Sequence, residues 1–423
     1  MYKIINVTVA FVASWLFFFP ITFTFLPSTI NSKMMMAVIG ILIVIFNILT
    51  GKQQHRISRS LLVIILIATI FSIICYFSVV INGTNEKAYT TYIISMLVWL
   101  SAAYTANKAI EHAHNYTSIR LISNYIIALC SVQCIVALLI YLIPALNTFV
   151  HTYTLIATSA SWESRLIGLG IAYDTAGSRF SAALIICAAM ICDHESNTKS
   201  NVLYFISFII ISIVGNMLSR TTIVGISIAV IYFLYKSKFW EARITPESVR
   251  NLKIILGLAV ITIAIIVPSY RIFPKFSSLI DFGFEGFINF IENGKWETHS
   301  SSILQGMWST WPDNLKTWII GDGYFADPDD PLLFYMGTDV GYARLIFYCG
   351  ILGLAVFASL FVYLTITYIK RHSYYASLFI FLLLIVFSVW IKVSTDIFLI
   401  FAFYFFIEST EQSRTLLTDE TSI

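Results

Sequence analysis

The chain has 423 residues, of which 58% are hydrophobic and 12% are charged, and its mean hydropathy is +0.83. Soluble domains carry roughly 25% charged residues, so this composition excludes an ordinary soluble globular protein. The formal net charge of +3 is spread over several segments, which excludes a basic nucleic-acid surface. All six cysteines fall in apolar segments without a CxxC pair, so we expect neither disulfides nor a zinc site.

Apolar runs of spanning length follow one another along the chain. A run of about 17–25 residues crosses the hydrocarbon core, and backbone polar groups in lipid must be satisfied within a helix. We therefore expect an all-α fold, a polytopic membrane helix bundle of about 12 transmembrane helices with a partly helical external loop. The expected helices cover residues 4–26, 35–50, 61–82, 89–106, 125–147, 178–192, 202–218, 221–235, 254–270, 343–369, 374–391 and 394–408. The stretch 202–235 is also compatible with one long broken helix.

Basic residues orient these helices, because cytoplasmic loops of membrane proteins carry an excess of Lys and Arg. Most of that excess lies in loops 51–60, 236–253 and 370–373, which places both termini in the cytoplasm. The first helix lacks a small-residue cleavage site, so we interpret it as a span and not as a signal peptide. The expected regions are residues 1–270 with helices 1–9 and the external segment 148–177, the large external (periplasmic) loop 271–342, and residues 343–423 with helices 10–12 and a cytoplasmic tail. Four tryptophans and a helical pattern at 299–319 predict that the large loop packs as a cap.

Arginines mark the external edges of several apolar runs. At such positions a long side chain often extends to the membrane interface only to keep its charged end hydrated. This alternative remains open for each arginine. Lysine would reach water equally well, yet the external membrane-edge cations in the central half of the chain are all Arg. Because the guanidinium fork binds phosphate bidentately, the set predicts a diphosphate-binding site formed by Arg165, Arg179, Arg220, Arg271 and Arg344.

Three external carboxylates are candidates for acid–base chemistry. Glu163 and Asp174 flank Arg165, and each is either a solvated partner of nearby arginines or a general base. Asp339 lies five residues before Arg344, where it either caps the next helix or acts on a substrate hydroxyl. The other acidic and histidine residues considered lack a metal-ligand spacing: Asp327, Asp329, Asp330, His151 and His299.

Four features, in this order, resemble the O-antigen polymerase and ligase superfamily, the Wzy-like and WaaL-like membrane glycosyltransferases. The first is an external Arg-containing segment followed by a small-residue helix, at 165–181. The second is the Ser219-Arg220-Thr221-Thr222 break, and the third is a large penultimate external loop that begins near Arg271. The fourth and most specific is the closing pattern IIGDGYF…TDVGYARLIFYCGILG. The resemblance covers most of the chain.

The resemblance implies a polymerase of lipid-linked oligosaccharide repeat units, which builds O-antigen or a related surface polysaccharide in the inner membrane as part of lipopolysaccharide biosynthesis. The growing glycan would leave its polyprenyl diphosphate and join the acceptor sugar hydroxyl of a new lipid-linked unit. The five arginines would bind diphosphate, Asp339 or Glu163 would be the catalytic carboxylate, and neither a cofactor nor a metal is implied. The expected partners are polyprenyl-diphosphate-linked oligosaccharides, membrane lipid and a chain-length regulator protein, with no nucleic acid.

Three alternatives stay open, and one of them, a structural or scaffold membrane protein, leaves the arginine set unexplained. A ligase would transfer the same glycan to lipid A-core, but ligases of the superfamily carry a histidine shortly before the following helix. The matching stretch here, residues 337–342, has none, which favours the polymerase. A polysaccharide or lipid-linked-substrate transporter would place paired ionisable residues near the middle of its spans, whereas charge here collects at the external edge.

Overall fold

The protein is helical throughout the part of the chain that its structure defines. The computed structural model describes residues 2–51, 58–155, 165–171, 173–193, 198–238, 246–272 and 274–407, and within these ranges β-pairing is limited to isolated bridges. The chain folds into two compact units. The first comprises Met1–Met35 and Ala106–Glu297, and the second comprises Met36–Thr105 and Thr298–Ile423.

Each expected span corresponds to a helix with shifted ends. The first unit contains α1 (Tyr2–Phe18), α5 (Ile119–Leu142), α6 (Pro144–Tyr153), α7 (Tyr173–Ile191), α8 (Thr198–Leu218), α9 (Thr222–Lys236), α10 (Pro246–Ile272) and α11 (Pro274–Asn293). The second unit contains most of α2 (Ser32–Leu49) and α4 (Tyr92–His114), with α3 (Arg59–Asn82), α12 (His299–Met307), α13 (Leu315–Ile319), α14 (Gly341–Arg371), α15 (Ala376–Val389) and α16 (Phe398–Phe405). Short 3₁₀ turns lie at Tyr335–Gly337 and Ser373–Tyr375.

Eight helices of the described chain are long and apolar enough to cross a membrane, namely α2, α3, α4, α5, α7, α8, α10 and α14. Three shorter apolar helices are Tyr2–Phe18, Thr222–Lys236 and Ser373–Val389. The first ends earlier than expected because Pro20 lacks the N–H that helix continuation needs. The fold is therefore an all-helical bundle of the membrane type.

The sequence patterns miss two features of the large loop. The expected helix at 299–319 is two helices, α12 and α13, since the chain leaves the helical conformation around Pro312. A further helix, α11, precedes them and belongs to the first unit, whereas α12 and the residues after it belong to the second. The loop is thus shared between the units, a division that the sequence patterns do not reveal.

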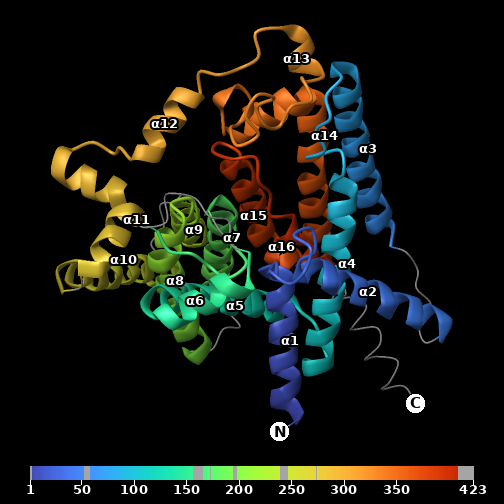
Figure 1. The fold of residues 1–423 in the computed structure, drawn as a ribbon. Helices are drawn as coiled ribbons and strands as arrows, with labels where there is room; N and C mark the ends of the chain where they lie inside the picture. The colour runs from blue at the N-terminus through green and yellow to red at the C-terminus, as the bar shows by residue number, and fades with distance from the viewer. Residues whose placement is uncertain are drawn as a thin grey trace. The chain divides into compact units, whose positions relative to one another are not determined.

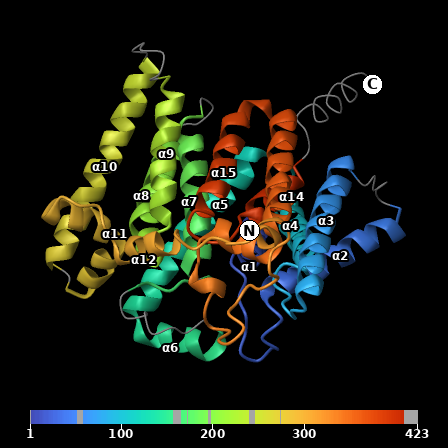
Figure 2. The same cartoon turned by 90° about the horizontal axis from the view of Figure 1, so that it is seen from above.

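In the first unit, α7 is the central helix. It packs against α5, α8 and α9, and α7, α8 and α9 lie side by side in Figure 2. Small residues allow this close packing, because a Cβ added at Gly225 of α9 would lie only 2.2 Å from the Cα of Ser181 on α7. The helices α8 and α9 are separate and are joined by a tight turn at residues 219–221, which decides against one broken helix.

In the second unit, α14 packs along α3, as Figure 1 shows. Gly350, with φ +66° and ψ −177°, interrupts α14 and frees backbone carbonyls in the preceding turn. The N–H of Asp322 donates to the Phe347 carbonyl at 2.6 Å, and that of Gly323 donates to the Tyr348 carbonyl at 3.2 Å. The Gly-Asp-Gly turn of the closing sequence pattern therefore serves to dock the end of the large loop onto a broken helix.

Candidate functional site

The turn between α8 and α9 is fixed by hydrogen bonds to α7. The Thr221 hydroxyl donates to Asp174 Oδ1 at 2.7 Å, and the Ser181 hydroxyl donates to the Thr221 carbonyl at 2.9 Å. Gly177 completes this contact, since a Cβ added there would lie 2.5 Å from Ser219 Oγ. The small residues of α7 thus hold the backbone on both sides of Arg220 and determine where its side chain begins.

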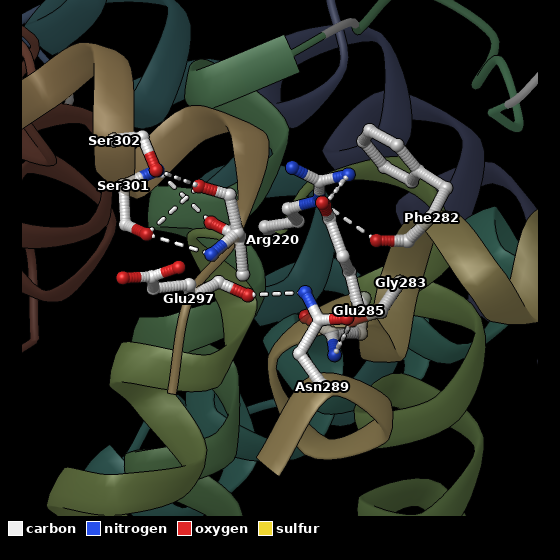
Figure 3. Close-up of polar contacts among 10 residues, drawn as sticks. Arg220, Phe282, Gly283, Glu285, Asn289, Glu297, Ser301 and Ser302 are labelled. Carbon is white, nitrogen blue, oxygen red and sulfur yellow. Dashed lines mark hydrogen bonds and ion pairs between the residues drawn. The ribbon is translucent and has the colours of Figure 1, made fainter. Parts of the chain in front are cut away.

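The Arg220 side chain extends from this turn to α11. Its Nε donates to the Phe282 carbonyl at 2.7 Å, and its Nη2 lies 2.5 Å from Glu285 Oε2. The guanidinium carbon lies 4.3 Å from the centroid of the Phe282 ring (Figure 3). The Arg220 and Glu285 side chains are 18% and 25% exposed, so the ion pair is largely but not fully shielded from solvent.

Arg165 approaches the same aromatic ring. Its guanidinium carbon lies 4.8 Å from the Phe282 centroid and 4.9 Å from that of Tyr173. The Leu166 N–H donates to the Met217 carbonyl at 3.1 Å, which ties this segment to the end of α8. The Arg165 Nε is buried and has no hydrogen-bond partner within the described part of the chain. Arg165 and Arg220, distant in sequence, therefore share one ring.

Burial and charge act together on Arg220, which lies in the turn outside the spanning helices. Burial lowers the pKa of its guanidinium, Glu285 opposes that shift, and the positive charge of Arg165 lowers the pKa further. Two guanidinium groups near one ring repel each other, so a carboxylate such as Glu285 stabilises their proximity. A dianionic ligand has the same sign of charge as this carboxylate, so the same position beside the two arginines favours it.

A break in α11 positions Phe282 and Glu285. Phe284 has non-helical torsions (φ −117°, ψ 18°), which releases the preceding carbonyls from the helical ladder. Two side chains satisfy them: Asn216 Nδ2 donates to the Gly283 carbonyl at 2.7 Å, and Arg220 Nε donates to that of Phe282. Figure 3 shows the contact of Arg220 with Phe282, and Asn289 bonded to the Glu297 carbonyl further along. The kink thus turns two backbone acceptors toward the end of α8.

The remaining arginines of the first unit do not join this pair. The Arg179 Nη1 donates to the Phe18 carbonyl of α1, and its guanidinium carbon lies 5.7 Å and 5.9 Å from the Phe18 and Phe19 ring centroids. Arg271 is exposed in the last turn of α10. Arg165 and Arg220 therefore meet at one ring, whereas Arg179 contacts residues at the end of α1, and the diphosphate-binding role of all three stays a prediction.

In the second unit, Arg344 forms a different cluster. Its Nη1 lies 2.8 Å from Asp339 Oδ1, and its Nη2 donates to the Phe325 carbonyl at 3.3 Å. The guanidinium carbon lies 3.9 Å from the Phe325 centroid and 4.3 Å from that of Phe334. The side chain is only 7% exposed, and its Nε finds no acceptor among the described residues.

Asp339 does not cap α14. The N-cap residue is Val340, and no side chain closes that end of the helix. The carboxylate is instead occupied with Arg344, one helical turn ahead, and its side chain is 19% exposed. The alternative in which Asp339 is a helix cap is therefore wrong, whereas its role toward a substrate hydroxyl stays a prediction. Glu163, the other candidate base, lies outside the described residues.

Polar residues that the sequence patterns did not single out lie close to α14. The Tyr92 hydroxyl donates to Asp396 Oδ2 at 3.4 Å, and the Tyr89 hydroxyl donates to the Ser394 carbonyl at 3.0 Å. The Tyr335 hydroxyl donates to Asp322 at 3.2 Å, and burial together with this carboxylate raises the pKa of Tyr335 to about 12. Tyr335 therefore remains a hydrogen-bond donor at neutral pH, which holds the Gly-Asp-Gly turn in place.

A cavity of about 500 Å³ lies elsewhere in the second unit, against α2, α3 and α4. Its lining is mostly aliphatic and aromatic, with Ser58, Ser101, Tyr104 and Arg371 as polar members. None of the residues expected to act on substrate lines it. The strongest candidate site is therefore the Arg165–Arg220 pair with Phe282 and Glu285.

Sequence reasoning found both arginines of this pair but missed Phe282 and Glu285. The signal available was the stretch Asp281-Phe282-Gly283-Phe284-Glu285-Gly286, in which a lone glutamate lies between two glycines in the loop that is expected to be external. That pattern predicts a helix break but not its partner. Comparisons of the chain with protein-family models, with known proteins and with solved structures find no match.

Proposed function

We propose that this chain is a membrane glycosyltransferase that polymerises lipid-linked oligosaccharide repeat units of an O-antigen or related surface polysaccharide. The observation that supports it most is the meeting of Arg165 and Arg220 at the Phe282 ring, at 4.8 and 4.3 Å. Paired guanidinium groups bind phosphate by charge-assisted hydrogen bonds, and a low-dielectric setting strengthens them. A polyprenyl diphosphate is the dianionic leaving group that this pair fits.

The proposed reaction moves one glycan between two oxygens. The bond between the anomeric carbon of the growing chain and its diphosphate oxygen breaks, and the electron pair leaves with the diphosphate. A bond forms from the anomeric carbon to the acceptor sugar hydroxyl, whose proton passes to a base. Arg165 and Arg220 stabilise the departing diphosphate, and Asp339 or Glu163 accepts the proton.

The proposed topology has about twelve spans, with α1, α9, α15 and α16 added to the eight long helices, both termini cytoplasmic and the active site periplasmic in the cell inner membrane. The surface of α11 supports a site at the level of the lipid headgroups. Phe287, Phe290 and Ile291 on that helix are 43%, 56% and 82% exposed. Exposed apolar side chains on an amphipathic helix insert at the headgroup boundary, where a polyprenyl diphosphate also lies.

Deletion and complementation test this function. In a strain that lacks the chain, surface glycan should shorten to single repeat units on the lipid core, and the full-length chain should restore the ladder of lengths. A core without glycan, together with polymer accumulating on the carrier lipid, would instead assign the ligase activity. A normal ladder in the deletion strain would exclude both activities.

A further inference from the structure

Glu285 occupies the position that a bound phosphate would take. Its Oε2 lies 2.5 Å from Arg220 Nη2, on the guanidinium that also contacts Phe282. Carboxylate and phosphate oxygens compete for the same guanidinium donors because both accept charge-assisted hydrogen bonds in the same fork geometry. A diphosphate that uses Arg220 must therefore displace Glu285 or share its donor.

The structure gives Glu285 room to leave without unfolding the site. Phe284 already departs from helical torsions, so the backbone before Glu285 is broken at that point. Asn216 holds the Gly283 carbonyl at 2.7 Å independently of Glu285, and Arg220 Nε holds that of Phe282. With α11 anchored by these two bonds, rotation of the Glu285 side chain, which is 25% exposed, is enough to open Arg220.

Arg165 provides a further donor for the incoming anion. Its buried Nε lacks a hydrogen-bond partner in the ranges that the structure describes, and a buried donor without a partner is costly to leave unmatched. A phosphate oxygen near Phe282 would satisfy it. The exchange of the carboxylate for a diphosphate thus replaces the Glu285–Arg220 ion pair with contacts to two guanidinium groups.

We propose that Glu285 is a counter-ion latch: it neutralises Arg220 while the site is empty, and a lipid-linked diphosphate displaces it on binding. This inference rests on the proposed function, because it assigns the same arginines to a diphosphate ligand. The latch lowers the apparent affinity for diphosphate in proportion to the fraction of molecules in which Glu285 holds Arg220. Between turnovers, Glu285 keeps Arg220 charged, paired and in position.

The test measures diphosphate binding to the purified full chain in lipid nanodiscs, with inorganic pyrophosphate and farnesyl diphosphate as probes. Glu285→Gln keeps the shape but removes the charge, and it should lower the dissociation constant for both probes by about 10-fold relative to the unmodified chain. Glu292→Gln, the same change at an exposed position of α11, should leave both constants unchanged. A larger gain for farnesyl diphosphate than for pyrophosphate would assign the ligand to the lipid side.

Each outcome decides something. Equal or weaker pyrophosphate binding by Glu285→Gln, with clear binding by the unmodified chain, would overturn the latch and leave the diphosphate site standing. Failure of both proteins to bind either probe would overturn the proposed function together with the latch. If Glu285→Gln does not fold, Glu285→Asp retracts the carboxylate by one methylene, and it should bind pyrophosphate more tightly than the unmodified chain; binding no tighter would count against the latch.

Discussion

Two arginine clusters, one in each unit, show how the same residue type serves different ends. In the first unit, Arg165 and Arg220 meet at Phe282 with Glu285 as the carboxylate in contact. In the second, Arg344 is 7% exposed, pairs with Asp339 and stacks against two phenylalanines. The first cluster brings two guanidinium groups to one ring beside the Glu285 carboxylate, whereas in the second a guanidinium that is 7% exposed pairs with a carboxylate that is 19% exposed.

The two clusters are therefore suited to different roles, the first to ligand binding and the second to the stability of the fold. Two guanidinium groups that converge on one ring create a positive potential that attracts an external anion. A closed one-to-one pair in an apolar setting contributes little net stability, but the loss of either member is costly. We therefore expect mutations in the first cluster to affect activity more than folding, and the reverse in the second.

The largest loss of stability should come from breaking the closed pair, Arg344 with Asp339. Arg344→Met removes the cation that pairs with the Asp339 carboxylate, whose side chain is 19% exposed, and this costs up to about 3–5 kcal/mol of stability. Thermal unfolding of the purified chain followed by intrinsic tryptophan fluorescence would measure the loss. The double variant Arg344→Met with Asp339→Asn removes both charges and should recover most of it.

The same pair also tests the catalytic role of Asp339. If the double variant is stable but still builds no polymer, Asp339 or Arg344 acts on substrate directly. If the double variant builds polymer of normal length and amount, Asp339 is purely structural, and Glu163 becomes the leading candidate for the base. Asp339→Asn alone does not separate these cases, since it also leaves Arg344 unpaired.

Mutations in the open cluster, which consists of Arg165, Arg220, Phe282 and Glu285, should lower the activity. Arg165→Lys and Arg220→Lys keep the positive charge but lose the planar fork, and the loss of a charge-assisted contact of about 1.5–3 kcal/mol predicts roughly 10- to 100-fold less polymer. Glycan ladders from complemented deletion strains, normalised to protein level, give the measurement. Arg271→Lys, at an exposed position, is the matched control and should leave the ladder unchanged. Near-normal polymer from both cluster variants would show that these arginines are interfacial side chains without a role in diphosphate binding.

The sequence predicts the helices far better than the contacts between them. Apolar length alone locates the eight described helices that are long and apolar enough to cross a membrane, because runs of about 17–25 apolar residues match the hydrocarbon core. Apolar length does not predict the break at Gly350 or the kink at Phe284, because both depend on contacts with distant segments. Gly350 lies against Ile319, and the kink at Phe284 is held by Asn216. For the same reason the sequence marks Arg220 as a predicted anion ligand but gives no sign of Glu285, its partner across the kink.

Removing the hydrogen bond that supports the kink in α11 should have a smaller effect, on stability and on pyrophosphate binding. Asn216→Ala leaves the Gly283 carbonyl without its 2.7 Å bond, and a buried acceptor without a partner costs about 1–3 kcal/mol. We expect lower thermal stability and, because Phe282 and Glu285 shift with the kink, weaker pyrophosphate binding than in the unmodified chain. Asn47→Ala, in the last turn of α2, is the control and should change neither. Lower stability with unchanged binding would show that the kink does not position the open cluster.

The smallest effect should come from the turn that carries Arg220. Thr221→Val replaces the hydroxyl that donates to Asp174 at 2.7 Å with a methyl group of similar size, which costs about 0.5–1.5 kcal/mol, the net contribution of one hydrogen bond. Since Thr221 adjoins Arg220, polymer yield should fall by up to roughly 10-fold while the protein stays folded. Thr69→Val on α3 removes a hydroxyl that bonds only to its own helix backbone, and it should leave polymer yield intact. Equal yields from the two variants would mean that the open cluster tolerates a loosened turn, and that the Arg220–Glu285 ion pair, more than the bonds to α7, holds the guanidinium beside Phe282.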